Sequence, residues 1–366
     1  MFGACAAADE PGEPSADGSA AGHGPSHGMA GSEGSADAEG LRERITLNAI
    51  DWSSEDGAPP PPLVPEREAA GDREDGSGAF RTHCLESHLL ADDPLVWPDE
   101  PGRSHLHVFF GNPDVEATTT VASLAEADTT TCDGVTLNRS GYWVPALLGA
   151  DGERIRFIDP LFYYKTGYHV PADTVRPPPA GLTIIAGDAM ADAPQDVEVA
   201  KFRCLSWEAP EPQFSTGDPL DHVPVIPDCE QGDIVEMRLV FPQCWDGERL
   251  TAHDHASHMA YPTSATAPDV GTGSCPPSHP VAIPEISYNF GVRVTEETGP
   301  STAWRFVTDP PDAEHGGISF HGDWMNGWDA DVMDTIVRNC LNEARECMVG
   351  LLGDGTQLRP VPLEGE

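Results

Sequence analysis

The chain has 366 residues, with 61 Asp and Glu against 20 Lys and Arg, and its formal net charge is -41. This charge excludes a protein that binds nucleic acid through an overall basic field, because the phosphate backbone would be repelled. No stretch approaches the roughly 18 to 20 consecutive apolar residues that a membrane-spanning helix needs. The 37 Gly and 36 Pro favour short elements joined by many turns, which argues against a helical bundle.

Residues 1–78 are rich in Gly, Ser, Ala, Asp, Glu and Pro, and their only aromatic residues are Phe2 and Trp52. Such a composition cannot bury enough apolar surface to offset the entropy of ordering, so it predicts a disordered acidic tail. The opening five residues, MFGAC, fit two origins equally well. They match the remnant of a lipoprotein signal with Cys5 as the lipidation site, and they match an ordinary start with an incidental cysteine.

From residue 79 onward the pattern predicts short strands separated by Pro and Gly. A single helix is expected from Ala330 to about Leu341, where apolar residues recur on one face. We therefore expect a mainly β fold, an antiparallel β-sandwich-like single domain over 79–355 with long loops and a C-terminal helix, followed by a C-terminal tail at 356–366. The clearest predicted strands lie at 105–110, 141–148, 155–164, 181–186, 233–241 and 285–293.

Eight cysteines follow Cys5, and none forms a C-x-x-C pair. An even number in a loop-rich chain predicts four disulfides and an oxidising compartment, although the pairing cannot be deduced. Cys340 and Cys347 are too far apart to be bridged along a continuous helix. Either each has another partner or the helix ends between them.

The cationic residues are also unusual, because only Lys165 and Lys201 are lysines and all others are arginines. An acidic, lysine-poor surface is typical of a halophilic protein, in which salt screens the repulsion between carboxylates. The codon usage of a GC-rich genome would produce the same bias. This observation concerns habitat and does not bear on activity.

Histidines supply the first candidate site. His105 and His107 are two apart and lie on one face of a predicted strand, which is the geometry of a chelating pair or of an acid and base side by side. Side chains from other segments are expected to join them, as in metal and hydrolytic sites. The predicted catalytic residues are His105, His107, His258, His321 and Asp323, and the predicted metal ligands are His105, His107 and His279. The expected cofactor, if there is one, is a divalent metal ion.

Aromatic residues follow Asp323 in a segment bounded by glycine. Trp324 and Trp328 flank Asn326, and indole faces beside an amide suit a sugar ring. The alternative is that both indoles are core residues that anchor the following helix. Tyr261 completes the predicted substrate-binding set of Tyr261, Trp324, Asn326 and Trp328. The chain has no P-loop or H-E-x-x-H motif, so nucleotide and zincin functions lack their usual signals. Its one G-x-S-x-G string, at 24–28, lies in the segment predicted to be disordered, so a serine hydrolase elbow also lacks support.

Seven segments of the chain, which include the histidines His105, His107, His258, His279 and His321, form a recognisable series. In their order along the chain they resemble the DUF1996 family, a domain of secreted fungal and bacterial proteins. The resemblance covers about residues 84–355 and implies export, disulfides and a compact domain, but no catalytic residue. His253 and His315 lie outside the matching segments. The matching segments are SHLHVFFGN (104–112), LNRSGYWVP (137–145), YYK (163–165), FPQCWDG (241–247), SHMAYP (257–262), CP with HP (275–280) and HGDW to NGW (321–328).

The leading functional hypothesis is a secreted or surface-tethered enzyme, a hydrolase or lyase that acts on polysaccharide through the histidine cluster. The first alternative is a non-catalytic module that binds glycan or cell wall, and the second is an extracellular metal-binding protein. The expected location is outside the cell or on its surface, and the expected partner is a polysaccharide or cell-wall glycan.

Overall fold

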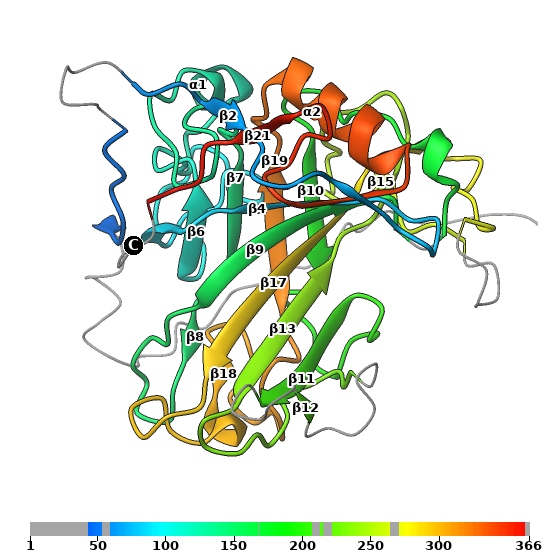
Figure 1. The fold of residues 1–366 in the computed structure, drawn as a ribbon. Coiled ribbons are helices and arrows are strands. Elements are labelled where there is room, and N and C mark those ends of the chain that lie inside the picture. Colours follow the sequence, from blue (N-terminus) through cyan, green and yellow to red (C-terminus); the bar gives the residue numbers. More distant parts are fainter. Residues whose placement is uncertain are drawn as a thin grey trace, which may run out of the picture. The chain divides into compact units, whose positions relative to one another are not determined.

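A computed structural model describes residues 43–52, 59–167, 169–206, 213–214, 222–263 and 271–362 of the chain. Strands dominate these residues, as the sequence predicted, and most of them belong to two large sheets (Figure 1). None of the described helices has the length and apolar character needed to cross a membrane.

The first large sheet has six strands, and every neighbouring pair in it is antiparallel. Its order is β1 (Ile45–Thr46), β5 (Glu86–Leu90), β6 (His107–Gly111), β7 (Gly141–Pro145), β19 (His321–Met325) and β10 (Thr183–Gly187).

The second large sheet has eight strands and contains one parallel pair, between β4 and β20. Its order is β12 (Gln213–Phe214), β11 (Ala200–Ser206), β13 (Ile234–Val240), β17 (Glu285–Arg293), β9 (Ile158–Lys165), β4 (Ala79–His83), β20 (Arg345–Val349) and β3 (Gly71–Asp72).

The two sheets pack face to face through their alternating apolar residues. Phe110 of the six-stranded sheet lies with its ring centroid 5.5 Å from Phe162 and 5.2 Å from Phe290 of the eight-stranded sheet. Tyr142 approaches Phe162 to 4.3 Å in the same layer. Because successive strand residues point to opposite faces, each sheet also has an outer face. The expected antiparallel sandwich is therefore present.

Smaller elements complete the domain. Helix α2 (Ala330–Ile336) starts at Asp329, whose carboxylate accepts hydrogen bonds from the backbone N–H groups of the first turn. A π-helical turn, η4 (Val337–Leu341), continues it to the predicted end. The remaining elements are β2 (Leu63–Pro65) with β21 (Thr356–Leu358), β8 (Leu147–Leu148) with β18 (Arg305–Phe306), the sheet β15 (Met259–Ala260), β14 (Cys244–Trp245) and β16 (Val281–Ala282), and the short helices α1 (Val121–Ala125), η2 (Ala172–Thr174) and η3 (Ser301–Ala303).

All eight cysteines after Cys5 form disulfides, which confirms the expected number of four. Cys340 pairs with Cys347 because the helical segment ends at Leu341 and the chain turns back into β20. The second of the two alternatives left by the sequence therefore holds. The other pairs are Cys84–Cys132, Cys204–Cys229 and Cys244–Cys275.

Part of the segment expected to be disordered has regular structure instead. Strand β1 pairs with β5, β2 with β21 and β3 with β20, and the Trp52 indole N–H donates to the carbonyl of Thr130 at 3.0 Å. The expected C-terminal tail, 356–366, likewise begins with β21. These short strands gain hydrogen bonds from sheet edges far away in sequence, which composition alone does not reveal. Residues 1–42, including Cys5, lie outside the described part of the chain.

Candidate functional site

Three of the predicted histidines meet at the outer face of the six-stranded sheet. The Nε2 atoms of His105 and His321 are 3.1 Å apart. The ring centroid of His107 lies 4.1 Å from that of His105 and 6.0 Å from that of His321. One nitrogen from each ring lies within 4.8 Å of the others. We call these three residues the histidine cluster.

The strand order explains how residues far apart in the sequence come together. His107 begins β6 and His321 begins β19, and these strands flank β7 on its two sides. His321 also pairs with Gly187 at the end of β10. Gly187 has a φ of +76°, and a side chain there would meet the carbonyl oxygen of Phe320 at 2.3 Å. Glycine at this position therefore permits the close approach that places His321 in the cluster.

Backbone carbonyls fix two of the three rings. The Nδ1 of His107 lies 2.9 Å from the carbonyl oxygen of Asp92, and the Nδ1 of His321 lies 2.8 Å from that of Ser319. A carbonyl can only accept, so both Nδ1 atoms carry the proton and both Nε2 atoms present a lone pair. The Nε2 of His107 is buried and has no hydrogen-bond partner. Such fixing of the second ring nitrogen is the usual arrangement around metal-binding histidines.

Burial keeps the cluster uncharged. It lowers the pKa of His105 to about 3, with a further contribution from His321, and lowers the pKa of His321 to about 4. The pKa of His107 is also lowered well below its usual value, first by burial and then by its two neighbours. All three imidazoles are therefore neutral near pH 7 and available as electron-pair donors.

Two carboxyl groups adjoin the cluster. Asp323, predicted from the sequence, and Asp93, which was not, each place an oxygen within 4.8 Å of a His107 nitrogen and of one another. Burial raises the pKa of Asp93 to about 6, and burial together with Asp93 raises that of Asp323 well above its usual range. One oxygen of Asp323 is buried without a partner. The signal for Asp93 was an acidic pair, Asp92-Asp93, inside the otherwise apolar run from Leu89 to Val96.

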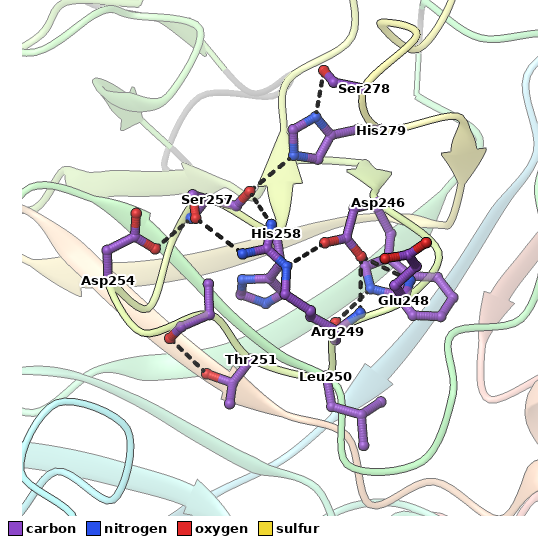
Figure 2. Close-up of polar contacts among 12 residues, drawn as sticks. Asp246, Glu248, Arg249, Leu250, Thr251, Asp254, Ser257, His258, Ser278 and His279 are labelled. Atoms are coloured by element: carbon purple, nitrogen blue, oxygen red, sulfur yellow. Dashed lines mark hydrogen bonds and ion pairs between the residues drawn. The ribbon is translucent and has the colours of Figure 1, made fainter.

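His258 and His279 belong to a different region, so two predicted site residues are not in the cluster. The Nε2–H of His258 donates to the carbonyl of Thr183 at 2.6 Å. Thr183 begins β10, whereas His321 pairs with Gly187 at its other end, about 13 Å away by the rise of a strand. Figure 2 shows His258 and His279 near Arg249 in a network of loop contacts, where the partly exposed His279 donates through Nε2–H to the Ser257 carbonyl.

Three of the four predicted sugar-contacting side chains are buried inside the domain. Trp324 is fully buried and Trp328 is 4% exposed, and the indole N–H of Trp328 donates to the hydroxyl of Tyr164 at 2.8 Å. The amide of Asn326 donates to the carbonyls of two prolines. The indoles therefore have no face open to a sugar, and the alternative of core residues holds. Of the four predicted residues only Tyr261 is exposed. Its hydroxyl donates to the carbonyl of Val240, in the eight-stranded sheet, at 2.8 Å.

A family model, described as a domain of unknown function (DUF1996), matches residues 93–328. The match covers well over half of the chain and includes the histidine cluster and both carboxyl groups. Comparison with the curated proteins and with the solved structures found no match. The family match agrees with the resemblance seen in the individual segments, and the chain therefore belongs to the DUF1996 family.

Proposed function

We propose that this protein is an exported metalloenzyme that holds a divalent transition metal in the histidine cluster and acts on polysaccharide. The observation that carries the metal site is the convergence of one ring nitrogen from each of three histidines. In His107 and His321 a backbone carbonyl holds Nδ1, which leaves the lone pair on Nε2. The four disulfides support export, because such bonds persist in oxidising compartments.

The spacing of the cluster suits a small metal ion. The Nε2 atoms of His105 and His321 are 3.1 Å apart. This separation would allow both atoms to bind one zinc or copper ion, whose bonds to imidazole nitrogen are roughly 2.0 to 2.1 Å long. His105 must present Nε2 without its proton, so its proton must move to Nδ1. His105 is only partly buried, and among the described residues no carbonyl holds its Nδ1, in contrast to the other two rings.

The donor set selects the class of metal. Three neutral imidazoles favour zinc or copper over calcium and magnesium, which prefer oxygen ligands. Asp93 and Asp323 lie beside His107 and offer either additional ligands or a carboxyl group that exchanges protons near the metal. A bound zinc or copper ion would supply Lewis acidity and lower the pKa of a coordinated water.

Hydrolysis or elimination at a glycosidic linkage is the reaction that this set of groups would serve. The partly exposed His105 places one edge of the cluster toward solvent. The two alternatives differ in a measurable way: a metal-binding protein without activity would bind the ion but release no product, and a glycan-binding module would need no metal.

The test is a calorimetric titration of metal-free protein with Zn²⁺, Cu²⁺, Ca²⁺ and Mn²⁺, followed by assays of acidic and neutral polysaccharides for new reducing ends or unsaturated products. We expect binding of Zn²⁺ or Cu²⁺, and a loss of affinity of about 100-fold or more in His321→Ala. His105→Ala, at the partly exposed edge, should lose affinity without unfolding.

His279→Ala is the matched control, because it removes an imidazole that is partly exposed, like that of His105, but lies outside the cluster. Unchanged affinity in His105→Ala and His321→Ala would overturn the metal site. Metal binding without any product would leave a metal-binding protein and remove the enzyme from the proposal.

A further inference from the structure

A pocket on the outer face of the eight-stranded sheet concentrates positive charge in this acidic protein. The pocket has a volume of about 150 Å³, and no Asp or Glu is among its ten lining residues. Four of the lining residues are cationic, in a chain where acids outnumber cations by 61 to 20. These four are Arg73, Arg81, Lys165 and Arg238.

Three of the cations lie on separate strands and Arg73 follows β3, and all four are held by acids that do not line this first pocket. Arg73 and Arg81 both pair with Glu346, while Lys165 pairs with Glu285 at 2.9 Å. Arg238 pairs with Glu236 at 3.0 Å. Arg73 also pairs with Asp75 at 2.9 Å. These pairs neutralise charge, but a guanidinium has five donors and an ammonium three, so each cation has more donors than its acid partners occupy.

One of these donors is buried without a partner. The Nε of Arg81 is inaccessible to solvent and makes no hydrogen bond among the described residues. The Arg81 guanidinium also lies 4.8 Å from the ring centroid of Tyr163, and Lys165 lies 5.8 Å from the same ring. Tyr163 therefore forms an aromatic wall beside the cations.

The pocket continues into a longer groove. A second pocket of about 430 Å³ shares Tyr163, Arg238 and Asn289 with it, and a third of about 560 Å³ shares Lys165 and Arg238. The third is also lined by Lys201 and the exposed Tyr261, so both lysines of the chain line this groove. Acids line both extensions as well, so the excess of positive charge is confined to the first pocket. These acids are Asp159 and Glu236 in the second pocket and Asp196, Glu198 and Glu285 in the third. The second reaches Ile158 at the other end of β9, about 23 Å from Lys165 by the rise of a strand.

We propose that this groove binds an acidic polysaccharide, with a carboxylate or sulfate of one sugar in the cationic pocket and neighbouring sugars along the sheet. Guanidinium groups bind such oxyanions through paired hydrogen bonds, and an exposed tyrosine ring suits a sugar face. The extension of the groove on both sides favours a polymer over a free ion. The inference takes up the polysaccharide part of the proposed function but shares no residue with the histidine cluster.

The test compares binding of a polyuronate, a sulfated polysaccharide, a neutral β-glucan and inorganic sulfate to the full chain without added metal, at low ionic strength. Asn289→Asp places a carboxylate in the pocket while keeping the oxygen that accepts from Arg238 Nε at 2.8 Å. We expect it to weaken binding of the acidic polymer by about tenfold or more, the equivalent of one charge-assisted hydrogen bond.

Asn339→Asp is the matched control. Its amide is also half-buried and donates to a backbone carbonyl, that of Leu352, but it does not line the groove. Tyr163→Glu provides a second variant with a carboxylate on the pocket wall, should Asn289→Asp fail to fold. Preference for the polyuronate or for the sulfated polymer would identify the anionic group.

Equal binding by Asn289→Asp or Tyr163→Glu and by Asn339→Asp would overturn the proposal, as would binding of inorganic sulfate without either acidic polymer. Because no metal is added, a failure here leaves the histidine cluster untested. A failure of the metal titration likewise leaves this groove unaffected.

Discussion

The polar side chains on the outer faces of the two large sheets differ in burial and in charge. On the six-stranded sheet, the imidazoles of His88 and His107 are almost completely buried and uncharged. On the eight-stranded sheet, Arg238 and Lys165 are partly exposed and form ion pairs with acids. The difference lies in coverage, since the long connections on either side of β6 fold over the first face. Alternation along a strand therefore predicts two faces but not which outer face is covered.

Truncating one aromatic residue on each outer face should give the largest difference in unfolding free energy between the two faces. Phe109 on the outer face of β6 is fully buried and stacks on His88 and Trp143. We expect Phe109→Ala to lower the free energy of unfolding by about 3 to 5 kcal/mol. The equivalent change Tyr163→Ala on β9 should cost about 1 kcal/mol or less, because this ring borders the open groove. Urea unfolding followed by tryptophan fluorescence measures both, and equal losses would contradict the comparison.

The faces should also respond to acid in opposite directions. Burial, with a contribution from Arg44, lowers the pKa of His88 to about 3. Between this value and the unfolded pKa of about 6.5, the unfolded state binds the extra proton, so stability is lost as the pH falls. At about pH 5 this loss amounts to about 2 kcal/mol. His88→Gln should flatten the fall in unfolding free energy between about pH 7 and 5 by this amount.

His83 on β4 provides the contrasting variant. Burial alone would lower its pKa, but the hydrogen bond to Asp159 and the charge of Asp133 raise it above the usual value. Its stabilisation is complete below the unfolded pKa and is lost as the pH rises through the raised folded value. His83→Gln should therefore cost more stability at about pH 6 than at about pH 8. The same direction of pH dependence in both variants would contradict these assignments.

Salt should produce the smallest effect, and its effect on stability should be opposite to its effect on binding in the groove. Screening relieves the repulsion that accompanies a net charge of -41, so the melting temperature should rise by a few degrees between low and molar salt. The same screening should weaken binding of an acidic polymer to the groove. A melting temperature that does not change with salt would leave codon usage as the explanation of the acidic composition.

Much of the histidine cluster was predictable because its signal is local. Two histidines at a spacing of two, His105 and His107, and the His321-Gly322-Asp323 segment carry their chemistry in consecutive residues. The indoles were misjudged as candidates for sugar contact because burial depends on the opposite sheet. Trp328 is buried through its contact with Tyr164, a residue 164 positions away.

The cationic groove had no local signal. Arg81, Lys165 and Arg238 lie on three different strands and are brought together by strand order alone. The short N-terminal strands were missed for the same reason, since Gly71 pairs with Glu346 at the far end of the chain. In contrast, the mainly β class follows from the period of the apolar residues, helix α2 from its period and cap, and the number of disulfides from the number of cysteines. These are properties of composition and of nearby residues.

The position of β20 has a consequence for how the chain reaches its native state. This strand lies between β3 and β4, so residues 345–349 pair with residues 71–72 and 79–81. The eight-stranded sheet cannot be completed until almost the whole chain has been synthesised. Contacts of such long sequence separation are slow to form, and until they form the edge of β4 stays open to pairing with other chains. A chain truncated before Arg345 would keep that edge exposed and should aggregate.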